Sequence, residues 1–97
     1  MFRATLDTDV DGSVVRMAGQ LTVEFLKDVE RLCISAEPPV LIDADGLRSC
    51  DAAGFAFLAR MRDGAVRVEG LSEYLEMRLR HEMIATRRIP PGRPRTP

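Results

Sequence analysis

The start of the chain alternates between apolar and polar residues. From Phe2 to Asp7 the pattern repeats every two residues, as in a strand with one solvated face. Turn-forming residues at 9–12 then lead into a second apolar segment at 14–18, which Gly19 closes. Two such segments around a short turn predict an antiparallel hairpin.

The pattern then changes to spacings of three and four residues, which predict an amphipathic helix. Thr22 stands at the expected N-cap of this helix. Its apolar stripe is formed by Phe25, Leu26, Val29, Leu32 and Cys33. Pro38 and Pro39 end the helix, and the continuous apolar run at 40–42 predicts a central strand covered on both faces.

Residues 43–50 are read as a loop, after which Asp51 is expected to cap a second helix that ends at Gly64. The alternation at 65–69 predicts a fourth strand, and Ser72 is the expected cap of a third helix. The buried positions of these two helices are expected to be Ala53, Phe57, Leu58 and Met61, and then Leu71, Leu75, Leu79 and Met83.

This order of elements predicts a small α/β domain over residues 1–84. An antiparallel N-terminal edge strand precedes a β-α-β-α-β unit, so the four-stranded sheet is mixed and about three helices cover it. Residues 85–97 are basic and rich in proline, and we expect them to form a mobile tail.

Composition narrows the classes of protein that fit. No apolar run approaches the length of a membrane span, and the N-terminus lacks the apolar stretch of a signal peptide, so we expect a cytoplasmic protein. The net charge of −1 conceals a basic segment, because residues 78–97 contain six arginines and one glutamate. No aromatic residue is interleaved with these arginines, which argues against direct binding of nucleic acid.

Candidate chemistry is sparse. The single histidine, His81, lies among arginines, and no nucleophile has a recognisable partner base, so we do not expect an enzyme. Cys33 and Cys50 lack the spacing of metal ligands; Cys33 is expected in the core, and Cys50 in a loop where the following helix could lower the thiol pKa.

Three carboxylates, Asp43, Asp45 and Asp51, lie close together in the sequence. They could hold a divalent cation. Hydrogen bonds to loop N–H groups and a helix cap explain them better. We therefore expect neither a metal nor a cofactor.

Four segments of the chain carry a pattern found together in one known family: residues 15–21, 40–43, 51–58 and 66–70. In their order and spacing they resemble the STAS domain, the module of anti-sigma factor antagonists and of sulfate transporter tails. The sequence Asp-Ala-Ala-Gly-Phe at 51–55 is similar to the family's Asp-Ser-Ser/Ala-Gly-Leu at the start of its second helix. The resemblance spans residues 2–80 and implies four strands, several helices and protein binding without catalysis.

The resemblance also implies a partner. Antagonists of this family bind an anti-sigma factor that is a histidine-kinase-like serine kinase, and this kinase phosphorylates the first serine of the motif. Here that position is Ala52, which has no acceptor, and the nearest hydroxyl, Ser49, is a poor substitute on the wrong side of Asp51. The implied partner surface comprises Thr22, Asp43, Ser49, Asp51, Ala52, Ala53, Gly54 and Phe55.

The chain departs from the family in other ways as well. Thr22 stands where the family often has Asp, the second helix and its loop are short, and the C-terminal part is reduced. Two other functions therefore stay open: an accessory subunit that binds the ATPase of a lipid-transporting ABC system, and a small nucleotide-binding module. A second copy of the chain is a further candidate partner, through the apolar edge at Phe2, Ala4 and Leu6.

Overall fold

A computed structural model describes residues 1–64 and 66–88 of the chain. In order, its elements are β1 (Phe2–Asp9), β2 (Gly12–Leu21), the 3-10 turn η1 (Val23–Phe25), α1 (Leu26–Ser35), β3 (Val40–Cys50), α2 (Ala52–Asp63), β4 (Arg67–Glu69) and α3 (Glu73–Arg88). Among these residues, no helix is long and apolar enough to cross a membrane.

The four strands form one mixed sheet in the order β1-β2-β3-β4. β1 is antiparallel to β2, whereas β2, β3 and β4 are parallel to one another. This confirms the predicted α/β fold with an antiparallel N-terminal edge strand. The register aligns one apolar row across the sheet, from Leu6 through Val15 and Ile42 to Val68.

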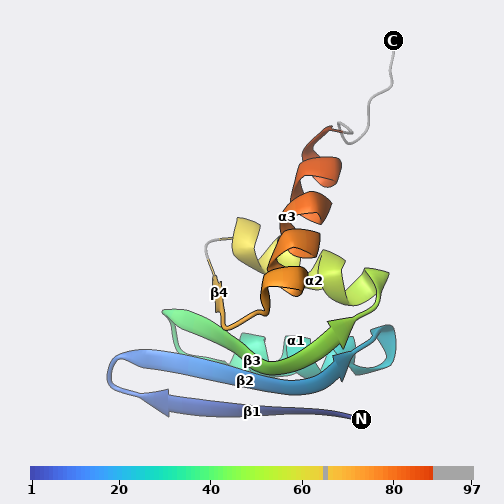
Figure 1. Cartoon of the computed structure of the whole chain (residues 1–97). Coiled ribbons are helices and arrows are strands. Elements are labelled where there is room, and N and C mark those ends of the chain that lie inside the picture. Colours follow the sequence, from blue (N-terminus) through green and yellow to red (C-terminus); the bar gives the residue numbers. More distant parts are fainter. Residues whose placement is uncertain (65, 89–97) are drawn as a thin grey trace.

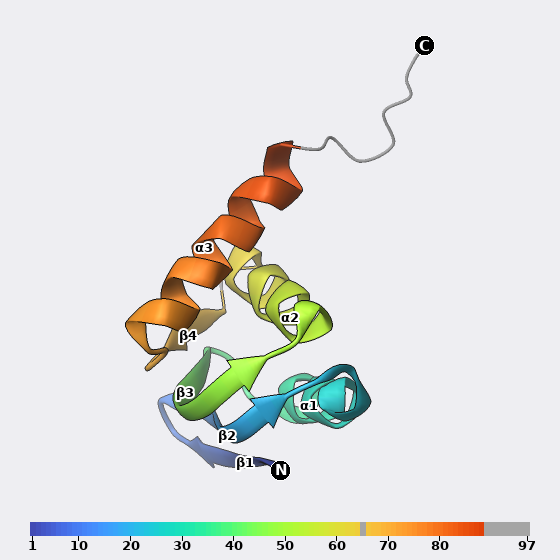
Figure 2. The same cartoon turned by 45° about the vertical axis from the view of Figure 1, so that its right-hand side comes forward.

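The helices pack against the strands and against one another (Figures 1 and 2). α1 packs against β1 and β2, α2 packs against β3 and β4, and α3 packs against α2. Together they enclose a single core, in which the largest fully buried side chains are Phe57, Leu21, Ile42, Leu58, Leu75, Leu79, Val15 and Val29.

The opposite face of the sheet, here called the open face, carries charged side chains. Arg16 and Asp43 are register partners on it, and their side chains are 52% and 35% exposed. Leu41, on the same face, is only half-buried. The prediction that the central strand is covered on both faces was therefore wrong, because the row that contains Arg16 and Asp43 stays in water.

The expected loop at residues 43–50 is also wrong, because β3 continues to Cys50. The pairing with β2 shifts register twice, between Arg16 and Ala18 and between Gly19 and Gln20. Each shift sets an extra residue of β3 against β2, as in a β-bulge. Gly46 lies at the first shift, where a Cβ would come within 2.9 Å of the Ala18 side chain.

The C-terminal part differs from expectation in length. Helix α3 continues to Arg88, four residues past the expected domain boundary at residue 84. Ser72 caps it as predicted, since its hydroxyl oxygen accepts a hydrogen bond from the Leu75 N–H at 3.2 Å. The remainder of the expected tail, residues 89–97, and position 65 of the fourth strand lie outside the described residues.

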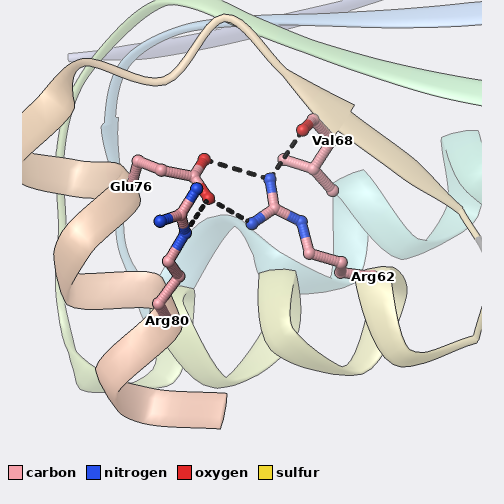
Figure 3. A network of polar contacts seen from close by, with 4 residues as sticks. All are labelled: Arg62, Val68, Glu76 and Arg80. Carbon is pink, nitrogen blue, oxygen red and sulfur yellow. Dashed lines mark hydrogen bonds and ion pairs between the residues drawn. The ribbon is translucent and has the colours of Figure 1, made fainter.

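An arginine on α2 ties together the last three elements (Figure 3). The Arg62 guanidinium donates to both carboxylate oxygens of Glu76, at 2.6 and 3.1 Å, and to the Val68 carbonyl at 2.7 Å. Arg80 also donates to Glu76, at 3.2 Å. The network joins α2 to both β4 and α3, which compensates for the short length of β4.

We expect this network to give the stability of the fold a specific pH dependence. The hydrogen bond from Arg62 lowers the pKa of Glu76 below its ordinary value of 4.5. A lowered folded pKa means that the stabilisation is present above pH 4.5 and disappears as the pH falls through the folded pKa. Glu76→Gln should lower the free energy of unfolding by about 1 kcal/mol at pH 7.

Urea unfolding of both proteins between pH 3 and 7 measures this difference, which should shrink below pH 4.5. Glu73→Gln is the matched control, because Glu73 lies in the same turn of α3 and is exposed. An equal loss in both variants, or a difference independent of pH, would contradict the role given to Glu76.

Candidate functional site

The carboxylate of Asp51 joins the starts of two helical segments. Its Oδ1 accepts a hydrogen bond from the Gly54 N–H at 2.8 Å, which caps α2. Its Oδ2 accepts a hydrogen bond from the Val23 N–H at 3.0 Å, at the start of η1. The Asp51 N–H donates to the Leu21 carbonyl at 3.0 Å. One residue therefore holds the ends of β2 and β3 and both helix starts together.

Thr22 occupies the predicted N-cap position, at the start of η1, but its side chain does not act as the cap. The Thr22 side chain makes no capping hydrogen bond, and its hydroxyl donates to Glu24 Oε1 at 3.3 Å. Asp51 supplies the acceptor for this helix start from 28 residues away. The predicted cap of α2 by Asp51 is confirmed.

Gly54 allows the two segments to approach closely. A Cβ at this position would lie 2.6 Å from the Leu21 carbonyl oxygen and 3.2 Å from the Cys50 side chain. Such a contact with backbone requires a shift of α2 or β2. Glycine at the N-terminus of α2 is therefore needed for packing rather than for a turn.

The predicted partner residues divide into three groups. Gly54 and Phe55 are buried, and the Arg78 guanidinium covers Phe55 at 5.0 Å from the ring centroid, so neither residue is exposed to a partner. Asp43 lies on the open face, where it accepts from the Asp45 N–H and forms an ion pair with Arg16. The others lie where β2 and β3 end and α2 begins: Thr22 follows β2, Ser49 is near the end of β3, and Asp51, Ala52 and Ala53 start α2.

The residues of this third group, together with Val23 and Glu24, form a surface that we call the Asp51 junction. Its most apolar exposed member is Val23, whose exposure is 64% although its N–H is bound to Asp51. Val23 was not among the predicted site residues, although an apolar residue directly after an expected helix cap could have indicated it. Ala52 is exposed beside it and Ala53 is half-buried.

The backbone of the junction is electropositive at α2. Within the part of the chain that the structure describes, the Ala52 and Ala53 N–H groups donate no hydrogen bond. These groups lie at the positive end of the helix dipole. Each of the two helix starts carries an acidic side chain, Asp51 at the N-cap of α2 and Glu24 in the first turn of η1. The surface therefore combines backbone donors, two carboxylates and an exposed valine.

The thiol beside the junction is not activated. Cys50 is half-buried at the end of β3, and burial, followed by the charge of Asp51, raises its pKa to about 11. Cys50 thus belongs to β3 and not to the expected loop, and its pKa is raised, not lowered as the following helix could have made it. Nor does any group of three or more His, Cys, Asp or Glu side chains suited to a metal ion occur among the described residues.

Comparisons with known proteins give no assignment: no protein-family model matches the chain, and no curated protein matches it.

We expect Asp51→Ala to be among the most destabilising changes outside the core. It removes the acceptors of two helix starts, and its cost should be about 2 kcal/mol in the free energy of unfolding. Chemical denaturation measures this loss. Ser72→Ala, which removes the single cap of α3, should cost about 1 kcal/mol, and Thr22→Ala less than about 0.5 kcal/mol. Equal losses in Asp51→Ala and Thr22→Ala would exclude the shared cap.

The raised pKa predicts that Cys50 reacts slowly in the folded protein. In a Cys33→Ser variant at pH 8, alkylation by iodoacetamide should be on the order of a hundredfold slower when folded than in urea, because the thiolate is the nucleophile. Mass spectrometry of timed samples gives both rates. Equal rates in the two states would contradict the burial of the thiol.

Proposed function

We propose that this chain is a non-catalytic regulatory module that binds a partner protein through the Asp51 junction. The resemblance indicates the class of partner, an anti-sigma factor that is itself a histidine-kinase-like serine kinase. In this proposal both proteins act in the cytoplasm. In this proposal the chain is an antagonist-like STAS protein that sequesters the anti-sigma factor.

The observation that carries the proposal is the double use of the Asp51 carboxylate. Both of its oxygens are occupied inside the fold, at 2.8 and 3.0 Å, so Asp51 positions the surface instead of presenting a free charge. The exposed Val23 and Ala52 are thereby fixed on two helix starts that cannot move independently. A preorganised apolar surface loses little entropy when it binds.

Ala52 determines whether phosphorylation can regulate the proposed binding. A phosphate in the first turn of α2 would add about two negative charges next to Asp51 and change the charge of the junction. Alanine cannot accept one. Ser49 is only half-exposed and lies within β3, paired with Gln20, so it is not a substitute in the helix turn. The module is thus proposed to bind its partner constitutively.

We expect Ala52→Glu to weaken the complex by at least about tenfold, because it places a charge at the centre of the surface. Affinity purification from the native host with wild type and variant side by side identifies the partner, and titration of the purified partner gives the affinities. Val10→Glu is the matched control: Val10 is fully exposed in the β1–β2 turn, at the opposite end of the strands (Figure 1).

The recovered partner decides between the classes. A kinase whose binding falls in Ala52→Glu and not in Val10→Glu supports the proposal, and this kinase should phosphorylate Ala52→Ser at residue 52 but leave wild type unmodified. An ABC ATPase would replace the proposal with the accessory-subunit function. Unchanged binding of Ala52→Glu would refute the assignment of the surface.

A further inference from the structure

The outer edge of β1 is unpaired in the described chain. β1 is the terminal strand of the sheet, and both views show no element beyond it (Figures 1 and 2). The Met1 carbonyl accepts a hydrogen bond from the Gln20 N–H at 3.0 Å, so Met1 faces β2. Backbone groups alternate along an antiparallel strand, so the N–H and C=O groups of residues 2, 4, 6 and 8 point away from β2.

Apolar surface accompanies these free backbone groups. Phe2, Ala4 and Leu6 pack against the core but remain partly exposed. Phe2 also stacks on Phe25, with ring centroids 5.1 Å apart. A neighbouring strand on this edge would cover the remaining apolar area on the helix-bearing side of the sheet and satisfy the outward-facing backbone groups.

The charges on β1 indicate which strand fits. Arg3 and Asp7 lie on the open face, two residues before and two residues after Thr5. Arg3 forms no ion pair within the described residues, whereas Asp7 binds Arg16 of the neighbouring strand. An antiparallel copy of β1 centred on Thr5 would place each Arg3 opposite an Asp7.

We propose that β1 pairs antiparallel with β1 of a second copy of this chain, with the two Thr5 residues opposite each other. Ala4 then pairs with Leu6 of the second copy and Phe2 with Thr8, through the outward-facing backbone groups. Arg3 of each copy forms a cross-strand ion pair with Asp7 of the other. The two sheets join into one of eight strands, with the helices of both copies on the same side.

The register centred on Thr5 pairs the charges of β1 better than the registers centred on Leu6 or Ala4. Centring on Leu6 would place Arg3 opposite Asp9, but Asp9 closes the turn, where its Oδ1 accepts from the Asp11 N–H at 2.8 Å. Centring on Ala4 would place Arg3 opposite Thr5 and Asp7 opposite Met1, so neither side chain would lie opposite a side chain of the other charge. The Thr5 centre alone among the three matches both charges within the strand.

The proposed dimer is independent of the proposed function. The Asp51 junction lies at the carboxyl ends of β2 and β3, whereas the dimer uses the lateral edge of β1. Either assignment can fail without the other. If both hold, the dimer presents two junctions to its partner.

Analytical ultracentrifugation of the full chain over a range of concentrations tests the pairing, and wild type should be a reversible dimer. Ala4→Pro removes an outward N–H without affecting the hydrogen bonds to β2, so it should yield a folded monomer. Arg3→Glu and Asp7→Arg each place like charges opposite one another, and each should raise the dimer dissociation constant by about tenfold.

The decisive measurement mixes the two charge variants. In a heterodimer of Arg3→Glu with Asp7→Arg, both cross-strand pairs are again opposite in sign, so the mixture should regain the affinity of wild type. Asp11→Arg is the matched control: it changes the charge equally, but in the turn, and should leave the dimer intact. A monomeric wild type, a dimer insensitive to Ala4→Pro, or a mixture no tighter than the single variants would each overturn the proposal.

Discussion

The structure depends on one carboxylate that is shared between two helix starts. The first N–H groups of a helix have no partner within the helix, and a nearby carboxylate both accepts their hydrogen bonds and interacts favourably with the helix dipole. Asp51 does this for α2 and for η1 at once, while its own N–H binds the end of β2. The carboxyl ends of the two central strands and the beginnings of two crossovers therefore meet at one residue.

Asp51 can cap both helix starts only because α2 packs closely against the end of β2. Gly54 brings the backbone of α2 close to the Leu21 carbonyl, because any Cβ there would lie 2.6 Å from the oxygen. At the other end of α2, Arg62 binds Glu76 and the Val68 carbonyl and so secures the three-residue strand β4 (Figure 3). Helix α2 is thus fixed at both ends, by an acidic residue at its N-terminus and by a basic residue in its last turn.

Periodicity alone predicted the elements whose residues alternate cleanly, as from Phe2 to Asp7, or recur at helical spacing, and local cap chemistry predicted Asp51 and Ser72. Periodicity did not predict the part of β3 that follows Ile42. Asp43, Asp45 and Gly46 are disfavoured in strands, and two register shifts break the alternation of apolar and polar residues. The second hydrogen bond of Asp51 spans 28 residues, so no local pattern could indicate it. The same long-range contact leaves Thr22, a good cap by residue type, without a capping hydrogen bond.

The charges of the open face explain why no described helix covers that side of the sheet. Arg16 lies between Asp7 and Asp43, and a helix packed over these groups would have to desolvate all three. A partner avoids this desolvation cost if it binds along the edge of a strand or at the ends of the strands. The unpaired edge of β1 and the Asp51 junction are at these two places. Asp7 belongs both to the charged row that keeps the open face in water and to the edge strand β1. The same charges therefore keep this face of the sheet free of helices and favour the proposed pairing of two copies.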